Sequence, residues 1–185
     1  MILIAFFVKD TLESNKLEDE LQLRPNQTMA MAISPKLFKN PLAMGPLQLI
    51  QNRLASERLA TQNLLDKLTY KVKIGIKSLD KNEPNYRGRY DLSENPSDPL
   101  ISRGFSYHNG PEWTHMRLFH NIAMQNNNIL DKYTEITKFK KVIDSNPYSS
   151  LPELTNCDGE KCGDSCDSQA WSLAKLIDLT DLIKH

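Results

Sequence analysis

Helical segments of two kinds follow one another in the first half of this chain, and polar segments that contain proline separate them. The run 28–38 is apolar almost all the way round a helix, which predicts an inner helix covered on both sides. The run 47–68 repeats leucine and isoleucine near helical spacing with polar residues between them, which predicts an outer helix with one buried face. Paired inner and outer helices are what a helical toroid contains. We therefore expect an all-α fold.

Three more helices are expected further along the chain, at 111–130, 133–144 and 168–183. Pro111 suits the first position of its helix, where no N–H group is needed. The run 78–103 precedes these helices, is rich in Asp, Asn, Pro and Gly, and shows no periodicity. Loops of that length inside a compact domain usually serve a function.

The charges of the chain balance, with 23 Lys and Arg residues against 23 Asp and Glu residues. We therefore expect neither nucleic acid nor an anionic membrane as a partner, whereas a neutral polysaccharide remains suitable. The odd number of cysteines (Cys157, Cys162 and Cys166) fits reduced thiols in a cytoplasmic protein. Because they lack a fourth cysteine and a nearby histidine, we expect no metal.

The apolar run 1–8 opens the chain without a preceding basic region or a small-residue cleavage site. It is also too short to span a bilayer. We favour a buried helix end, or simply the point at which the sequence was begun, over a signal peptide.

Two loops place a glutamate directly after a proline, at Glu112 and Glu153. Proline restricts the backbone before each carboxylate, and aromatic, amide and hydroxyl side chains lie close by in the sequence. Such side chains suit sugar chemistry, because pyranose faces stack on Trp and hydroxyls bind carboxylates and amides. The alternative is that each glutamate merely lies in the first turn of a helix, where negative charge is favoured by ~0.3 to 1 kcal/mol.

Four blocks of sequence connect these loops with a known family. The blocks are Leu-Arg-Pro-Asn at 23–26, Gly-Phe-Ser-Tyr-His-Asn-Gly-Pro-Glu-Trp at 104–113, Leu-Pro-Glu-Leu-Thr-Asn at 151–156, and Ser-Cys at 165–166 with Gln-Ala-Trp-Ser at 169–172. In order and spacing they resemble the C-terminal region of the eukaryotic glycogen debranching enzymes. The resemblance divides the chain into a non-matching segment, 1–19, and a C-terminal part of a glucosidase domain, 20–185.

This resemblance implies a fold and an activity. The fold is part of an (α/α)6 barrel, roughly its C-terminal half. The activity is that of an amylo-α-1,6-glucosidase, an inverting glycoside hydrolase that removes the glucose left at a glycogen branch point and needs no cofactor. The same polypeptide normally also carries a 4-α-glucanotransferase domain, and nothing here resembles that domain. The implied partners are glycogen or a branched limit dextrin and the missing N-terminal portion of the same enzyme, in the cytoplasm.

The resemblance also assigns roles to residues. Glu153 matches the general base, and the general acid is an aspartate upstream of every matched block, so we expect the chain alone to be inactive. The matched residues expected to bind substrate are Tyr107, His108, Asn109, Glu112, Trp113, Asn156, Gln169 and Trp171. For Glu112, ordering of a loop is the alternative role. We expect Glu112, Glu153 and the start of the Trp171 helix to meet at one end of the helices.

Some positions depart from the family pattern. Residues 114–117 read Thr-His-Met-Arg and place charge where a barrel wall is expected, while Tyr148 and Gly163 stand where the family tends to have Trp and Pro. Two alternatives therefore stay open. One is a catalytically inactive fragment that acts as a glycogen-binding or interaction module. The other is a small unrelated helical interaction protein.

Overall fold

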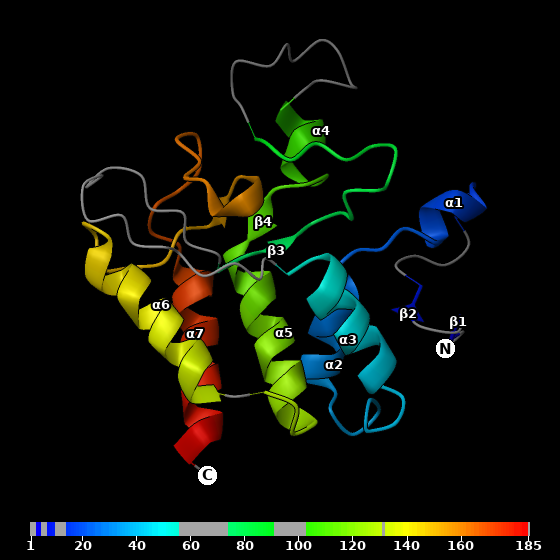
Figure 1. The fold of residues 1–185 in the computed structure, drawn as a ribbon, viewed down its shortest axis with the longest axis horizontal. Coiled ribbons are helices and arrows are strands. Elements are labelled where there is room, and N and C mark those ends of the chain that lie inside the picture. Colours follow the sequence, from blue (N-terminus) through cyan, green and yellow to red (C-terminus); the bar gives the residue numbers. More distant parts are fainter. Residues whose placement is uncertain are drawn as a thin grey trace.

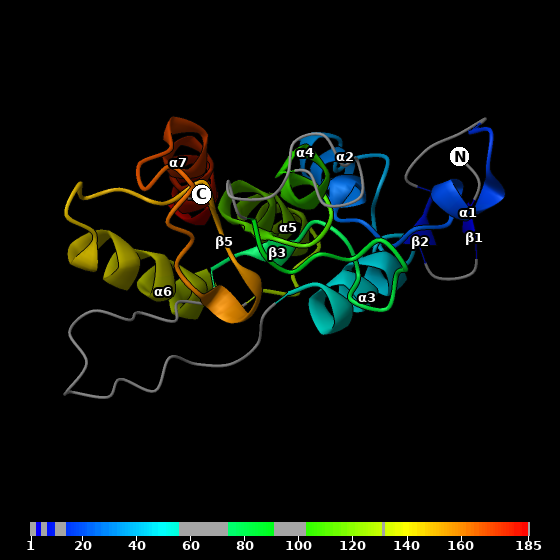
Figure 2. The same ribbon diagram turned by 90° about the horizontal axis from the view of Figure 1, so that it is seen from above.

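Helix α5 lies at the centre of the fold and contacts most of the other long helices. The computed structural model describes residues 3–4, 7–9, 14–55, 74–90, 103–130 and 132–184. Its long helices are α2 (Asn26–Ile33), α3 (Met44–Arg53), α5 (Thr114–Asn126), α6 (Lys132–Ser145) and α7 (Ala170–Lys184). Helices α2 and α7 pack on the two sides of α5, and α3 and α6 both lie on one side of this row, near its opposite ends (Figures 1 and 2).

The remaining described elements are short. They are β1 (Leu3–Ile4), β2 (Phe7–Val8), α1 (Leu17–Glu20), β3 (Ile76–Lys77), α4 (Arg103–Tyr107), β4 (Glu112–Trp113), β5 (Leu154–Thr155) and the 3-10 turn η1 (Cys157–Gly159). Strands β1 and β2 form an antiparallel pair near the N-terminus. Among the described residues, no helix has both the length and the apolar character needed to cross a membrane.

A small antiparallel sheet in the order β3-β4-β5 caps one end of α5 (Figure 1). Ile76 pairs with Trp113 on one side of β4, and Glu112 pairs with Thr155 on the other. The all-α prediction is therefore correct only in its coarse form: the described fold is mostly helical and contains this sheet. The helix predicted at 111–130 is found as α5, but it begins only at Thr114 and ends at Asn126. Pro111 lies before it, and its carbonyl accepts a bond from the Ser78 N–H (3.0 Å).

The first two predicted helices end earlier than expected. Helix α2 ends at Ile33 because the next residue, Ser34, precedes a proline and leaves the helical region (φ −121°, ψ 60°). Ile33 is 68% exposed, so the predicted inner helix is not covered on both sides. Helix α3 ends at Arg53, and Ala55 already pairs with Ile76. The rest of the predicted 47–68 helix lies outside the described residues.

The last two predicted helices are confirmed to within two residues, as α6 and α7. The long loop 78–103 is confirmed over 78–90, which contains turns and no helix or strand, whereas Arg103 already begins α4. A cluster of large apolar side chains joins α5, α6 and α7 at their contact. Its buried members are Ile74, Leu118, Ile122, Phe139, Val142, Leu151 and Leu179.

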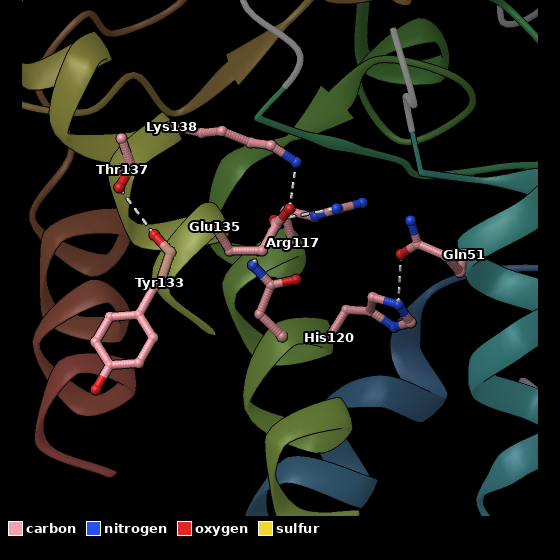
Figure 3. A network of polar contacts seen from close by, with 8 residues as sticks. Gln51, Arg117, His120, Tyr133, Glu135, Thr137 and Lys138 are labelled. Atoms are coloured by element: carbon pink, nitrogen blue, oxygen red, sulfur yellow. Dashed lines mark hydrogen bonds and ion pairs between the residues drawn. The ribbon is translucent and has the colours of Figure 1, made fainter. Parts of the chain in front are cut away.

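The charge at Arg117, which departs from the family pattern, is buried and paired. Arg117 is 5% exposed, and its Nη2 donates to Oε2 of Glu135 on α6 (3.1 Å). Asn121 donates to the same oxygen (3.1 Å), and Lys138 binds the other oxygen of Glu135 (Figure 3). Burial alone would raise the pKa of Glu135, but the positive charges of Arg117 and Lys138 outweigh it and hold the pKa below its ordinary value.

Arg117→Met should lower the free energy of unfolding by ~3 to 5 kcal/mol at pH 7, because it removes one partner of a buried ion pair. Urea unfolding followed by circular dichroism measures this loss. Because the folded pKa of Glu135 is depressed, the stabilisation is present above the unfolded pKa and disappears as the pH falls through the folded one. The difference between wild type and Arg117→Met should therefore shrink in acid.

Lys161→Met is the matched control, because Lys161 forms an ion pair with Asp167 in which its own side chain is 66% exposed. An exposed pair of this kind contributes about 0 to 1 kcal/mol. Equal losses for Arg117→Met and Lys161→Met, or a difference that does not depend on pH, would contradict the described pairing.

Candidate active site

The backbone of Glu153 is fixed between three parts of the fold. Its N–H donates to the Cys166 carbonyl (2.9 Å), and its carbonyl accepts from the N–H of Thr114, the first residue of α5 (3.1 Å). Just before it, the Pro152 carbonyl accepts from the hydroxyl of Ser172 on α7 (3.1 Å). The loop that carries Glu153 is thus attached to the start of both helices, and the side chain that it presents is only partly buried.

Two donors bind one oxygen of the Glu153 carboxylate. The Tyr107 hydroxyl lies 2.5 Å from Oε1, and Nε2 of Gln169 lies 3.3 Å from the same atom. Within the described part of the chain, no donor binds Oε2. Burial, and then the bond to Glu153, raise the pKa of Tyr107, so the phenol keeps its proton and acts as the donor. The carboxylate is therefore oriented through one oxygen, and the other remains available.

Aromatic rings gather beside this carboxylate. Tyr107 is 4.7 Å from Trp113 and 4.8 Å from His108, measured between ring centroids, and His108 stacks on Trp113 with an angle of 6° between the ring planes. Trp171, at the start of α7, is 6.0 Å from Trp113 and 44% exposed. Four of the predicted substrate-binding residues therefore lie together, with one tryptophan open to solvent.

His115 is a member of this aromatic cluster that the sequence interpretation missed. Its ring stacks on Trp171 at 4.4 Å and meets the edge of Trp113 at 5.3 Å. Burial lowers its pKa to about 4, so the ring is neutral at pH 7. In the sequence His115 reads only as part of a departure from the family pattern, and no spacing signal marks it as a neighbour of Trp171.

Glu112 lies on the other side of strand β4 and is fully buried. Adjacent strand residues face opposite ways, so Trp113 enters the aromatic cluster while Glu112 turns away from it. Its Oε1 accepts from the N–H of Asp158 in turn η1 (3.1 Å) and lies 3.8 Å from Nζ of Lys77. This placement favours the loop-ordering role over direct contact with substrate. The three loops meet at one end of the helices as expected, but in the described part of the chain Glu112 faces turn η1 and not the aromatic cluster beside Glu153.

Both predicted asparagines use their side chains to hold loops. Oδ1 of Asn156 accepts from the N–H of Tyr90 (2.9 Å). Nδ2 of Asn109 donates to the Phe105 carbonyl (2.7 Å), and its Oδ1 accepts from Arg24 (2.7 Å). Direct contact of these amides with a substrate remains a prediction. Arg24 belongs to one of the four sequence blocks, but nothing in the sequence indicated that it reaches this loop.

Among the described residues, no group of three or more His, Cys, Asp and Glu side chains is placed to hold a metal ion. Cys157, Cys162 and Cys166 are all free thiols. The described side chains around Glu153 can bind, orient and transfer a proton at a carboxylate.

A carboxylate held by a phenol and an amide beside an exposed tryptophan contains the kinds of side chain that suit the binding of a sugar. The chain belongs to the amylo-alpha-1,6-glucosidase family, whose model matches residues 5–178 and so includes most of the segment 1–19. The chain is 31% identical over 190 residues to the glycogen debranching enzyme of Saccharomyces cerevisiae. That alignment covers 92% of this chain and 11% of the yeast protein. The predicted resemblance is thereby confirmed, and the chain spans about a tenth of the length of this relative.

Gly75→Ala should destabilise the site end of the fold by ~1 to 3 kcal/mol, because the new methyl group overpacks it. A Cβ at Gly75 would lie 2.6 Å from Cβ of Glu112 and 2.7 Å from the Glu112 carbonyl oxygen. Gly104→Ala is the control, since a Cβ there meets nothing within 4 Å. Thermal unfolding of the two variants measures the difference, and equal melting temperatures would contradict the close approach of Gly75 to Glu112.

Proposed function

We propose that this chain supplies the general-base side of an amylo-α-1,6-glucosidase site, which hydrolyses the α-1,6-linked glucose at glycogen branch points with inversion. The observation that carries the proposal is the orientation of Glu153 by Tyr107 and Gln169 through a single oxygen. Oε2 is then the atom that takes a proton from the attacking water. In an inverting enzyme the paired carboxyl groups stand ~6.5 to 9.5 Å apart, which leaves room for that water.

The general acid in this proposal comes from a part of the longer polypeptide upstream of the matched blocks. Glu112 does not replace it, because its carboxylate is fully buried and faces turn η1. An acid must protonate the glycosidic oxygen for the leaving group to depart, and general acid catalysis contributes typically ~10² to 10⁴-fold. The chain by itself is therefore proposed to lack measurable turnover.

Aromatic faces are the second part of the proposed site. Trp171 is 44% exposed and is backed by His115, which fixes the plane of its ring. A pyranose ring can stack on such a face while its hydroxyl groups bind amide and carboxylate side chains. We assign this surface to the glucose unit or to the glucan chain next to the bond that is cleaved.

We also propose that the row α2, α5 and α7, with α3 and α6 outside it, is an arc of an (α/α)6 barrel (Figure 2). The support is a groove of about 470 Å³ formed by these three helices alone. It is lined by apolar side chains of α2 and α5, among them Ile33 and Phe119, with Leu182 and charged residues of α7. Further helices of the longer polypeptide would cover this face and complete the barrel.

The biological setting follows from the family and is likewise a proposal. The substrate is glycogen or a branched limit dextrin, and the process is glycogen catabolism in the cytoplasm. In a debranching enzyme the same polypeptide normally carries 4-α-glucanotransferase activity, which would trim each branch before the glucosidase acts. The portion of the polypeptide that holds the acid and the transferase is the partner of this chain.

A second candidate function is binding of glycogen without hydrolysis. The observation in its favour is that the exposed face of Trp171 and its backing ring are complete without a general acid. The two functions can be told apart once the rest of the glucosidase domain is supplied. A hydrolase then releases glucose, whereas a binding module retains its affinity for glucan but releases no glucose.

Glu153→Gln should abolish release of glucose from a branched limit dextrin when the chain is joined to the rest of its glucosidase domain. The amide keeps the size of the carboxylate but cannot accept the water's proton, so the loss should appear in kcat rather than in KM. Azide should restore turnover by replacing the activated water. Tyr107→Phe should keep the base but lose its orienting bond, with a decrease of about 10-fold or more because hydrogen bonds to charged groups contribute ~1.5 to 3 kcal/mol.

Glu112→Gln is the comparison variant, because it changes the other proline-linked glutamate and leaves Glu153 untouched. It should alter stability more than turnover. Near-normal hydrolysis by Glu153→Gln, or a larger loss of kcat in folded Glu112→Gln, would contradict the assignment of the base.

Trp171→Ala should weaken binding of maltooligosaccharides to the chain by ~1 to 3 kcal/mol, in proportion to the lost stacking of one aromatic ring. Protein NMR titration with maltotriose measures the change. Tyr133→Ala is a matched control, since Tyr133 is an exposed ring (69%) on α6, away from the aromatic cluster. Equal affinities of the wild type and Trp171→Ala would remove Trp171 from the binding surface.

A further inference from the structure

The guanidinium group of Arg24 connects the segment before α2 with two distant loops. Its Nη1 donates to the carbonyls of Ser78 (3.2 Å) and His108 (2.8 Å). Its Nη2 donates to Oδ1 of Asn109 (2.7 Å), and its Nε donates to Gln22 (2.9 Å). A planar group with donors on three sides is thus used as a bridge, which a point charge on a flexible chain cannot reproduce.

The loop that Arg24 holds also carries Tyr107. Asn109 closes this loop by donating to the Phe105 carbonyl (2.7 Å), and the Tyr107 carbonyl accepts from the indole N–H of Trp113 (3.3 Å). Two of the acceptors of Arg24, at positions 108 and 109, directly follow Tyr107 in the chain. A displacement of these residues would therefore move the phenol.

A second contact makes the loop dependent on an accurate fit. The Asn109 carbonyl accepts from the N–H of Arg87 (2.5 Å), and a Cβ at Gly110 would lie 1.9 Å from the Arg87 carbonyl oxygen. The loop is therefore packed tightly against 87–88 on one side. Arg24 fixes it from another side, through both a backbone carbonyl and a side-chain amide.

We propose that Arg24 is a positioning residue of the site. It holds the 107–109 loop in the position at which the Tyr107 hydroxyl reaches Oε1 of Glu153. The chain of contacts runs from Arg24 to His108 and Asn109, then through the backbone to Tyr107, and from its hydroxyl to the carboxylate. The catalytic meaning of this contact rests on the proposed role of Glu153 as the base. The dependence of the Tyr107 position on Arg24 does not rest on that role.

The coupling can be measured in the chain without any hydrolysis. With tyrosine labelled at Cζ with ¹³C, each of the six tyrosines gives one NMR signal, and Tyr107→Phe identifies that of Tyr107. Donation of a hydrogen bond to a carboxylate moves the Cζ signal, so Glu153→Gln should shift it toward the position of a tyrosine without that bond. Arg24→Gln should shift the Tyr107 signal in the same direction.

Three further variants decide how Arg24 acts. Arg24→Lys keeps the charge but loses the planar fork, and it should shift the signal as Arg24→Gln does. In the Glu153→Gln background, Arg24→Gln should add no further shift, because the contact through which it acts is already altered. Lys161→Gln is the control, since it removes an equal charge at an exposed salt bridge to Asp167. It should leave the Tyr107 signal unchanged.

An unchanged Tyr107 signal in Arg24→Gln would overturn the proposal. So would a normal signal in Arg24→Lys alongside a shift in Arg24→Gln, because the effect would then be one of charge and not of position. Should Arg24→Gln fail to fold, Arg24→Lys keeps the charge and should by itself give the shift. In the joined glucosidase domain, Arg24→Lys should lower kcat with little change in KM. A Tyr107 signal that does not depend on Arg24 refutes this inference, whereas normal hydrolysis by Glu153→Gln refutes only the proposed function.

Discussion

The pairing of strand β4 with β3 and β5 is the constraint on which the site depends. The strand has only two residues, and because neighbouring strand residues face opposite ways, each has a separate task. Glu112 faces the buried side and orders turn η1, while Trp113 faces the aromatic cluster. The next residue, Thr114, begins α5 and donates its N–H to the Glu153 carbonyl. Three consecutive residues thus determine where the base loop, the central helix and the aromatic rings meet.

Two buried carboxylates of the fold are each paired with an arginine. Asp80 and Glu135 are both largely buried, and each is bound by an arginine, Arg53 and Arg117 respectively. Removing a carboxylate from water costs several kcal/mol, and only close partners with good geometry offset that cost. Arg117 therefore does not disrupt the helical wall on which it lies. It is part of a polar contact between α5 and α6 that needs Glu135 and Asn121 to be complete.

The sequence was most informative where a pattern is local. Helices α6 and α7 were predicted closely, since their periodicity extends over several turns, and the four sequence blocks marked the residues of the site. Strand β4 could not be predicted, because two residues show no periodicity and the pairing with Ile76 and Thr155 joins distant parts of the chain. Arg24 and His115 were missed for the same reason. The partners of Arg24 in the two distant loops are 54 to 85 positions away, and the stacking of His115 on Trp171 arises only when α5 and α7 pack together.

The two halves of an inverting site need not touch, and this property allows them to come from separate parts of a polypeptide. A gap of ~6.5 to 9.5 Å between base and acid holds the attacking water, so the base must be oriented by its own neighbours and not by the acid. Every described contact that orients Glu153 comes from within this chain: Tyr107 and Gln169 on the carboxylate, and Thr114 and Cys166 on the backbone. The direction in which Oε2 points is therefore set before any acid is brought near. In the proposed function, what the rest of the glucosidase domain supplies is the acid, at the distance of one water molecule, and the remaining walls that keep other water out.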